Sequence, residues 1–72
     1  MERYRNSSGN SGVYGYEIGN DYIRVQFSSG QTYRYSYNGK AGRNHVENMK
    51  SLARSGSGLN SYNNSYVKYK YD

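Results

Sequence analysis

The 72-residue sequence predicts a small α+β domain, with a three-stranded antiparallel meander, one covering helix and a C-terminal strand or extended tail. Three observations support this fold class. Apolar and polar residues alternate over residues 13–18, 22–27 and 32–37, which is the period of half-buried strands. Apolar residues recur at helical spacing over residues 43–54. Eleven tyrosines accompany few aliphatic residues, which indicates a core that uses tyrosine rings as packing material.

The first turn, at residues 20–21, sets the register of the first hairpin. A two-residue turn places Tyr16 opposite Val25 and Glu17 opposite Arg24. The apolar residues then share one face of the sheet, and the opposite charges pair on the other face.

The second turn, at residues 28–30, has two interpretations with opposite consequences. A three-residue loop with Gly30 in the left-handed conformation turns Tyr33 and Tyr35 into the core. A two-residue turn places them outside, as an aromatic platform beside Arg24. We favour the three-residue loop, because glycine tolerates the positive φ that it needs and the polar residues then face solvent. The predicted core tyrosines are Tyr14, Tyr16, Tyr33 and Tyr35.

The favoured register sets Arg34 opposite Arg24 on the outer face, where Glu17 is the neighbouring carboxylate. Two arginines with one carboxylate predict a half-neutralised anion site. The chain carries a formal net charge of +5, which favours acidic partners such as nucleic acid. Charge of this size is also common in small soluble domains, so an anion site and ordinary solubility charge are equally weighted hypotheses.

The spacing over residues 43–54 predicts a helix that ends before Gly56. Its apolar face comprises Val46, Met49, Leu52 and Ala53, and its opposite stripe comprises Arg43, Glu47, Lys50 and Arg54. Residues 59–66 predict a short turn that buries Leu59 and Tyr62. Residues 66–71 alternate again, which predicts a fourth strand or an extended tail along the sheet edge.

Residues 1–12 are polar and lack an apolar period, so they predict a flexible N-terminal tail. Residues 13–72 then form the single domain. No apolar run reaches the length of a membrane span or a signal-peptide core. Together with the absence of cysteine, this favours a cytoplasmic protein.

Several short motifs follow one another in a familiar order over about residues 13–71. They are GYE at 15–17, IRVQF at 23–27, SSG at 28–30, YRY at 33–35 and GLN at 58–60. This order resembles the KTSC domain, a family named for its occurrence at the C-terminus of some lysyl-tRNA synthetases and also found as small stand-alone bacterial and phage proteins. The sequence departs from the family pattern in the proline-free loop at 38–42 and in Asn63, where a large apolar residue is expected. The resemblance implies an uncharacterised module for which RNA binding is suspected.

The chain offers few groups for catalysis or metal binding. It has one histidine, His45, and no cysteine, so neither an acid–base pair nor a metal-ligand set is apparent. We expect His45 to be a packing or solvated residue near the start of the helix. The sequence therefore predicts a protein that is not an enzyme and that needs no cofactor or metal.

Two functional hypotheses follow from the sequence. The leading one is RNA binding through a basic surface. Its candidate residues are Arg24, Arg34, Arg43, Lys50, Arg54, Lys68 and Lys70, with Tyr22 and Tyr66 available to stack on bases. The alternative is a protein-interaction or accessory module that binds another chain, or a second copy of itself, through an exposed sheet edge.

Overall fold

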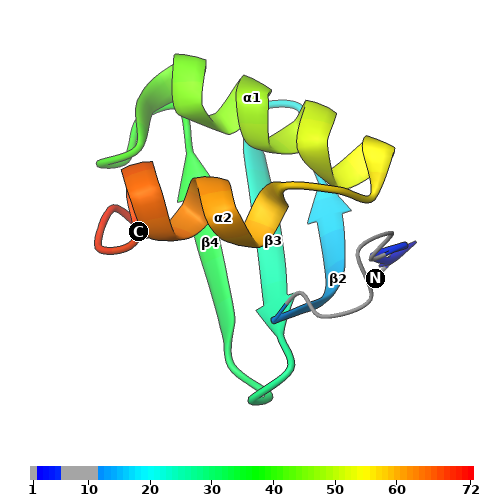
Figure 1. Cartoon of the computed structure of the whole chain (residues 1–72). Helices are drawn as coiled ribbons and strands as arrows, with labels where there is room; N and C mark the ends of the chain where they lie inside the picture. The colour runs from blue at the N-terminus through cyan, green and yellow to red at the C-terminus, as the bar shows by residue number, and fades with distance from the viewer. Residues whose placement is uncertain (1, 6–11) are drawn as a thin grey trace.

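A four-stranded antiparallel sheet, in the order β1-β2-β3-β4, carries helices on one of its faces (Figure 1). The computed structural model describes residues 2–5 and 12–72. The strands are β1 (Glu2–Arg3), β2 (Val13–Ile18), β3 (Tyr22–Phe27) and β4 (Thr32–Ser36). The helices are α1 (Gly42–Ser55), α2 (Leu59–Tyr62) and the π-helical turn η1 (Asn63–Val67). The α+β class is confirmed, with one strand more than predicted.

Both predicted hairpin registers are confirmed. Tyr16 lies opposite Val25 between β2 and β3, and Tyr35 lies opposite Ile23 between β3 and β4. Gly30 has φ of 98°, as the three-residue loop requires. Because the side-chain period of a strand is two, this loop length directs Tyr35 into the core.

The prediction that Tyr14 belongs to the core is wrong. Its side chain is 52% exposed, whereas its neighbour Val13 is 2% exposed. The pairing of β2 with β3 shifts between Val13 and Gly15, which marks a β-bulge. One extra residue in a strand reverses the alternation beyond it, so Val13 points inward and Tyr14 outward. Gly15 in the middle of the strand was the available signal, because an interior glycine often accompanies a bulge.

Residues 2–5 correct the prediction of a flexible tail over residues 1–12. Glu2 and Arg3 form β1, which pairs with β2. The amide of Tyr4 donates a hydrogen bond of 3.0 Å to the carbonyl of Tyr14, and the Tyr4 side chain is 4% exposed. A buried tyrosine ring compensates the cost of ordering a short polar segment. The tail prediction for residues 1 and 6–11 lies outside the described residues.

The core lies between the sheet and the helices. Its sheet-side members are Tyr4, Val13, Tyr16, Ile23, Val25 and Tyr35, and the others are Ala41, Val46, Met49, Ala53, Leu59 and Val67. The predicted apolar face of α1 is confirmed, with Leu52 only partly buried at its margin. Gly56 ends α1 in the left-handed conformation, and its amide donates to the carbonyls of Leu52 and Ala53. Leu59 is buried and Tyr62 half-buried, as predicted for the following turn.

Of the two alternatives predicted for residues 66–71, the fourth strand is wrong, and a tail along the sheet edge is present only at the chain end. Tyr66 and Val67 belong to η1, and residues 68–72 form neither a helix nor a strand. The chain end instead runs beside β4, where the amide of Asp72 donates to the carbonyl of Arg34 at 2.8 Å. The helical conformation buries Asn63 together with Val67, one turn apart, and this tertiary burial outweighs the alternating pattern.

Candidate nucleic-acid interface

The nine residues predicted for RNA binding lie on three separate surfaces. Tyr22, Arg24 and Arg34 lie on β3 and β4; Arg43, Lys50 and Arg54 lie on α1; Tyr66, Lys68 and Lys70 lie at or after η1. Only the last group lines one common hollow. The three surfaces differ in how far their charges are already neutralised.

On the outer face of the sheet, both arginines have carboxylate partners. Arg24 lies opposite Arg34, as predicted, and its Nη1 is 3.4 Å from Oε1 of Glu17. The Arg34 guanidinium lies over the Tyr22 ring, 4.9 Å from its centroid, and its Nε is 3.6 Å from Oδ2 of Asp72. Asp72 thus supplies a second carboxylate that the hairpin registers alone did not reveal. The expected half-neutralised anion site is therefore corrected to two ion pairs.

A hydrogen bond keeps one of these carboxylates ionised. The Tyr22 hydroxyl donates to Oε2 of Glu17 at 2.7 Å. This bond, with a smaller contribution from Arg24, lowers the pKa of the Glu17 carboxyl below its ordinary value. The same bond raises the pKa of Tyr22, because the carboxylate holds the phenolic proton. Glu17 therefore competes with any phosphate for Arg24.

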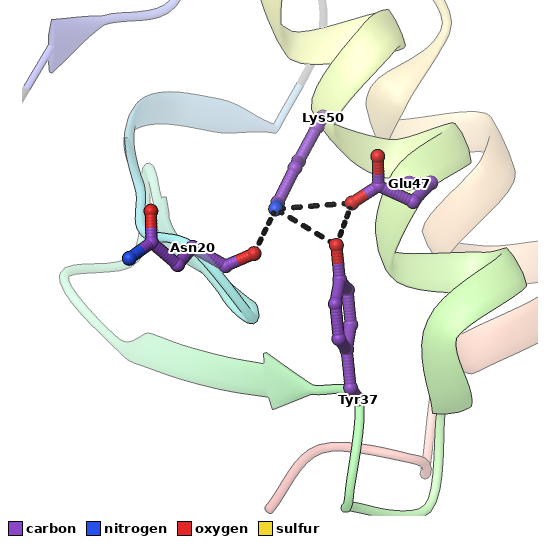
Figure 2. Close-up of polar contacts among 4 residues, drawn as sticks. All are labelled: Asn20, Tyr37, Glu47 and Lys50. Carbon is purple, nitrogen blue, oxygen red and sulfur yellow. Dashed lines mark hydrogen bonds and ion pairs between the residues drawn. The ribbon is translucent and has the colours of Figure 1, made fainter.

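Lys50 is buried, which corrects its assignment to an exposed stripe. Its side chain is 6% exposed, and its Nζ lies 3.0 Å from Oε2 of Glu47 and 3.2 Å from the carbonyl oxygen of Asn20 (Figure 2). The Tyr37 hydroxyl, 3.5 Å from Nζ, donates to the same Glu47 carboxylate. The Tyr37 bond, followed by the bond from Lys50, lowers the pKa of Glu47. Lys50 therefore ties α1 to the β2–β3 turn and is not free to bind a phosphate.

The other two cations of α1 lie at its opposite ends. The Arg43 guanidinium lies over the Tyr37 ring, 5.4 Å from its centroid. Arg54 is exposed in the last turn, beside a hollow that Glu2 and Tyr16 also line. The Tyr16 hydroxyl donates to Glu2 there at 3.4 Å, so this hollow contains a carboxylate as well as a cation. Arg43 shares the Tyr37 ring with Lys50, whose Nζ lies 5.1 Å from the same centroid and is already paired with Glu47.

The third group lines an open hollow of about 640 Å³, which we call the lysine–tyrosine hollow. Its lining residues are Lys40, Asn64, Ser65, Tyr66, Lys68, Tyr69 and Lys70. The rings of Tyr66 and Tyr69 are 57% and 74% exposed. Within residues 2–5 and 12–72, none of the three lysines has a carboxylate within ion-pair distance. This is the one predicted group in which no cation has a carboxylate partner in the described chain, whereas the sheet group has two ion pairs and the α1 group has one, at Lys50.

Sequence reasoning missed Lys40 and Tyr69 as members of this hollow. Lys40 lies in the loop before α1, far along the chain from Lys68. Tyr69 lies within residues 66–71, where the sequence predicts a fourth strand or an extended tail and where no strand forms. Only the turn from η1 into the chain end brings these residues together, and no local pattern announces that turn.

A small aromatic stack holds Tyr66 at the rim of the hollow. The Tyr66 ring lies 4.7 Å from the Tyr62 ring and 6.0 Å from the His45 ring, measured between centroids. Nδ1 of His45 lies 2.7 Å from the Tyr62 hydroxyl, which also accepts a hydrogen bond of 3.1 Å from the Asn48 amide. His45 therefore packs against tyrosines, one of the two roles predicted for it. The stack orients an exposed ring at little further entropic cost.

Comparison of the chain with protein-family models, with curated proteins and with solved structures found no match. The resemblance to the KTSC domain therefore stays a hypothesis that rests on the order of short motifs. In the described part of the chain, no three histidine, cysteine or acidic residues gather as a metal site. The described helices are also too short or too polar to cross a membrane. A functional proposal thus has to come from the surface chemistry of the chain itself.

Proposed function

We propose that this protein is a non-enzymatic RNA-binding module that binds through the lysine–tyrosine hollow. One observation carries the proposal: Lys40, Lys68 and Lys70, unpaired with carboxylates in the described chain, surround the exposed rings of Tyr66 and Tyr69. A nucleic acid complements both kinds of group, since its phosphates attract ammonium groups and its bases stack on aromatic rings.

Electrostatic competition favours this hollow over the outer face of the sheet. A phosphate that approaches Arg24 or Arg34 must displace a carboxylate that already lies within 3.4 or 3.6 Å. A phosphate that approaches Lys68 has no carboxylate to displace, because the contact of this ammonium group is with the Tyr69 ring, 5.6 Å from its centroid, and the release of counterions favours binding. The hollow is therefore the better phosphate site, although the sheet face has more arginine.

Two further features favour RNA over DNA. Asn64 and Ser65 line the hollow and are exposed, so their polar side chains can exchange hydrogen bonds with a ribose 2′-hydroxyl. The motif order also resembles the KTSC domain, for which RNA binding is suspected. We therefore take single-stranded or looped RNA, whose bases are accessible, as the partner.

The test is fluorescence anisotropy with a labelled single-stranded RNA decamer between about 50 and 200 mM salt. The combined change Lys40→Ala, Lys68→Ala and Lys70→Ala should weaken binding at least tenfold at low salt. It should also reduce the slope of log K against log salt by about 2, since each phosphate contact to a single strand contributes about 0.7. The measured slope counts the phosphate contacts that the hollow supplies.

A control with the same loss of charge separates this site from general charge attraction. Arg3→Ala, Arg24→Ala and Arg54→Ala together remove three exposed cations that lie elsewhere on the surface. This variant should keep most of the affinity. Equal losses in the two triple variants would show that net charge, rather than the hollow, drives binding. Failure of the wild-type protein to bind the decamer at low salt would overturn the function.

The alternative, a protein-interaction module, would use a different surface. The helices cover one face of the sheet and leave the other uncovered (Figure 1). At the β4 edge, the amide of Asp72 donates a hydrogen bond to the carbonyl of Arg34, so the chain end covers only part of this edge. The rest of the edge is where a second chain would pair. This alternative predicts a mass that rises with concentration in sedimentation equilibrium and no affinity for the decamer.

A further inference from the structure

A second hollow adjoins the lysine–tyrosine hollow. The two share Asn64, Lys68 and Tyr69 as lining residues. The second hollow has a volume of about 230 Å³, several times the ~30 Å³ that one water molecule occupies in the liquid. We call it the aromatic pocket, and its remaining walls are Phe27, Tyr33, Tyr35, Asn63 and Tyr71. Its size and its position next to three lysines make it a candidate for a planar group attached to a phosphate.

Flat aromatic rings form the walls of the pocket. The ring of Tyr71 lies 4.5 Å from the ring of Tyr33, and Phe27 meets Tyr33 edge to face at 5.7 Å. Tyr71 is 37% exposed, and Tyr33 and Phe27 are only partly buried, so a ligand can reach these rings from solvent. Aromatic walls of this kind stack on planar heterocycles.

One wall of the pocket is polar and fixed. Tyr35 is 1% exposed, and its hydroxyl accepts a hydrogen bond of 2.7 Å from Nδ2 of Asn63. A hydroxyl that accepts one bond keeps its own proton as a donor. Burial raises the pKa of Tyr35, so this proton is retained at neutral pH. Tyr35 and Asn63 thus form a fixed polar wall, and Asn64, which lines the pocket and is exposed, adds an amide that a nucleobase can reach beside the stacking surfaces.

We propose that the aromatic pocket receives one unstacked base of a single-stranded RNA, while the adjoining phosphates lie against Lys68 and the other lysines of the neighbouring hollow. This inference rests on the proposed function and deepens it, because it assigns a separate pocket to one base of the single strand. Bases within a duplex are paired and stacked and cannot enter such a pocket without being extruded. Charge complementarity sets the orientation, since Lys68 lines both hollows and lies where the backbone of the inserted nucleotide would pass.

The turn η1 builds the junction between the two hollows. It provides Asn63 to the aromatic pocket and Asn64 to both. Irregular helical turns of this type occur frequently at functional sites. The same turn that removes the expected fourth strand therefore creates the proposed base site.

The test compares three labelled decamers of equal length and charge. The first is an RNA backbone with every position abasic, and the second carries a single adenine at its centre. A third repeats the second with deoxyribose. The single adenine should increase affinity at least about fivefold, which corresponds to the ~1 kcal/mol of one stacked base. Because the phosphates are identical, this difference isolates the pocket from the lysines.

Variants then assign the effect to the pocket wall. Tyr71→Ala should abolish the preference for the adenine-bearing decamer, and Tyr71→Phe, which keeps the ring, should retain it. Tyr14→Ala removes another exposed tyrosine away from both hollows and should also leave the preference unchanged. Circular dichroism of each variant verifies that the fold is intact.

The outcomes separate this inference from the function on which it rests. Equal affinity of the wild-type protein for the abasic and adenine-bearing RNA decamers would overturn the base site while leaving phosphate-directed binding in place. A preference for the adenine-bearing decamer that survives in Tyr71→Ala would likewise overturn the base site. If the protein binds none of the three probes and also fails to bind an ordinary RNA decamer, the proposed function itself is overturned. Equal binding of the deoxyribose probe would overturn the selection of RNA.

Discussion

Asn63 lies where the resemblance to the KTSC domain predicts a large apolar side chain. A single hydrogen bond explains how this polar side chain can be buried. The side chain is 5% exposed, and its Nδ2 reaches the hydroxyl of Tyr35, which is itself 1% exposed. Two polar groups that satisfy each other can be buried at small net cost, whereas either one alone would be expensive. The sequence shows both residues but not that they meet.

The hydrogen bond between Asn63 and Tyr35 predicts that removing the Tyr35 hydroxyl lowers stability more than removing the Tyr33 hydroxyl. Tyr35→Phe should lower the free energy of unfolding by about 1–3 kcal/mol, because the buried amide of Asn63 loses its acceptor. Tyr33→Phe is the matched control, since the Tyr33 hydroxyl donates to Gln31, an exposed partner, at 2.6 Å. It should change stability by no more than about 0.5 kcal/mol. Urea unfolding of both variants measures the difference, and equal losses would contradict the buried bond.

Lys50 shows why the periodic pattern misassigned one candidate residue. It lies four residues after Val46 and three before Ala53, so buried residues flank it on the helix. A long alkyl stem lets lysine occupy such a position when its ammonium group finds acceptors. The acceptor from the sheet side is the carbonyl of Asn20, thirty residues earlier in the chain. A pattern read along the helix alone contains no information about that carbonyl.

Turns and helix ends are the elements that the sequence predicted best. Gly30 and Gly56 both have positive φ, at 98° and 75°, as their places in the turn and at the helix end required. This success has a local cause, since few other residues adopt the left-handed conformation without strain. The bulge in β2 was missed although Gly15 is a local signal for it, and the helical turn η1 was missed because it depends on contacts with other elements.

The two glycines allow a paired test of element geometry. Alanine at either position should cost about 1–2 kcal/mol through the left-handed backbone alone. A Cβ at Gly30 meets nothing within 4 Å, whereas a Cβ at Gly56 would lie 2.4 Å from Cβ of Arg5. Gly56→Ala should therefore be the more destabilising change in thermal or urea unfolding. If the two losses are equal, the N-terminal residues do not pack against this helix end in solution.

At the scale of the whole molecule, the N-terminal residues connect the sheet to α2. Tyr4 follows β1, and its hydroxyl accepts a hydrogen bond of 3.2 Å from the amide of Leu59 at the start of α2. A 72-residue chain has a small core, so one buried tyrosine is a substantial part of it. The segment that the composition assigned to a tail is therefore, in residues 2–5, part of the folded unit.

Removing this ring should destabilise the entire domain. Tyr4→Ala should cost about 3–5 kcal/mol, comparable to the loss of other buried aromatic side chains. That is a large share of the ~5–15 kcal/mol typical of a folded domain. Arg3→Ala, next to it but exposed, should cost less than about 0.5 kcal/mol. Urea unfolding compares the two, and a loss below about 1 kcal/mol for Tyr4→Ala would show that the segment is detached.

Local sequence was sufficient for the α+β class, both hairpin registers, the inward direction of Tyr35 and the limits of α1 to within one residue. Each of these follows from the strand or helix period, or from a glycine at a turn, so neighbours along the chain carry the information. The candidate site was different: Lys68, Lys70 and Tyr66 were named, but their grouping with Lys40 was not.

The remaining features arise from contacts between distant parts of the chain. Asp72 neutralises Arg34 on β4, Asn63 bonds to Tyr35, and Tyr4 reaches Leu59. Because such contacts already pair the arginines of the sheet, we place the proposed interface at the lysines of the chain end. Their physical cause is burial and pairing in three dimensions, where the free energy of one contact outweighs the weak preference of an alternating or polar segment.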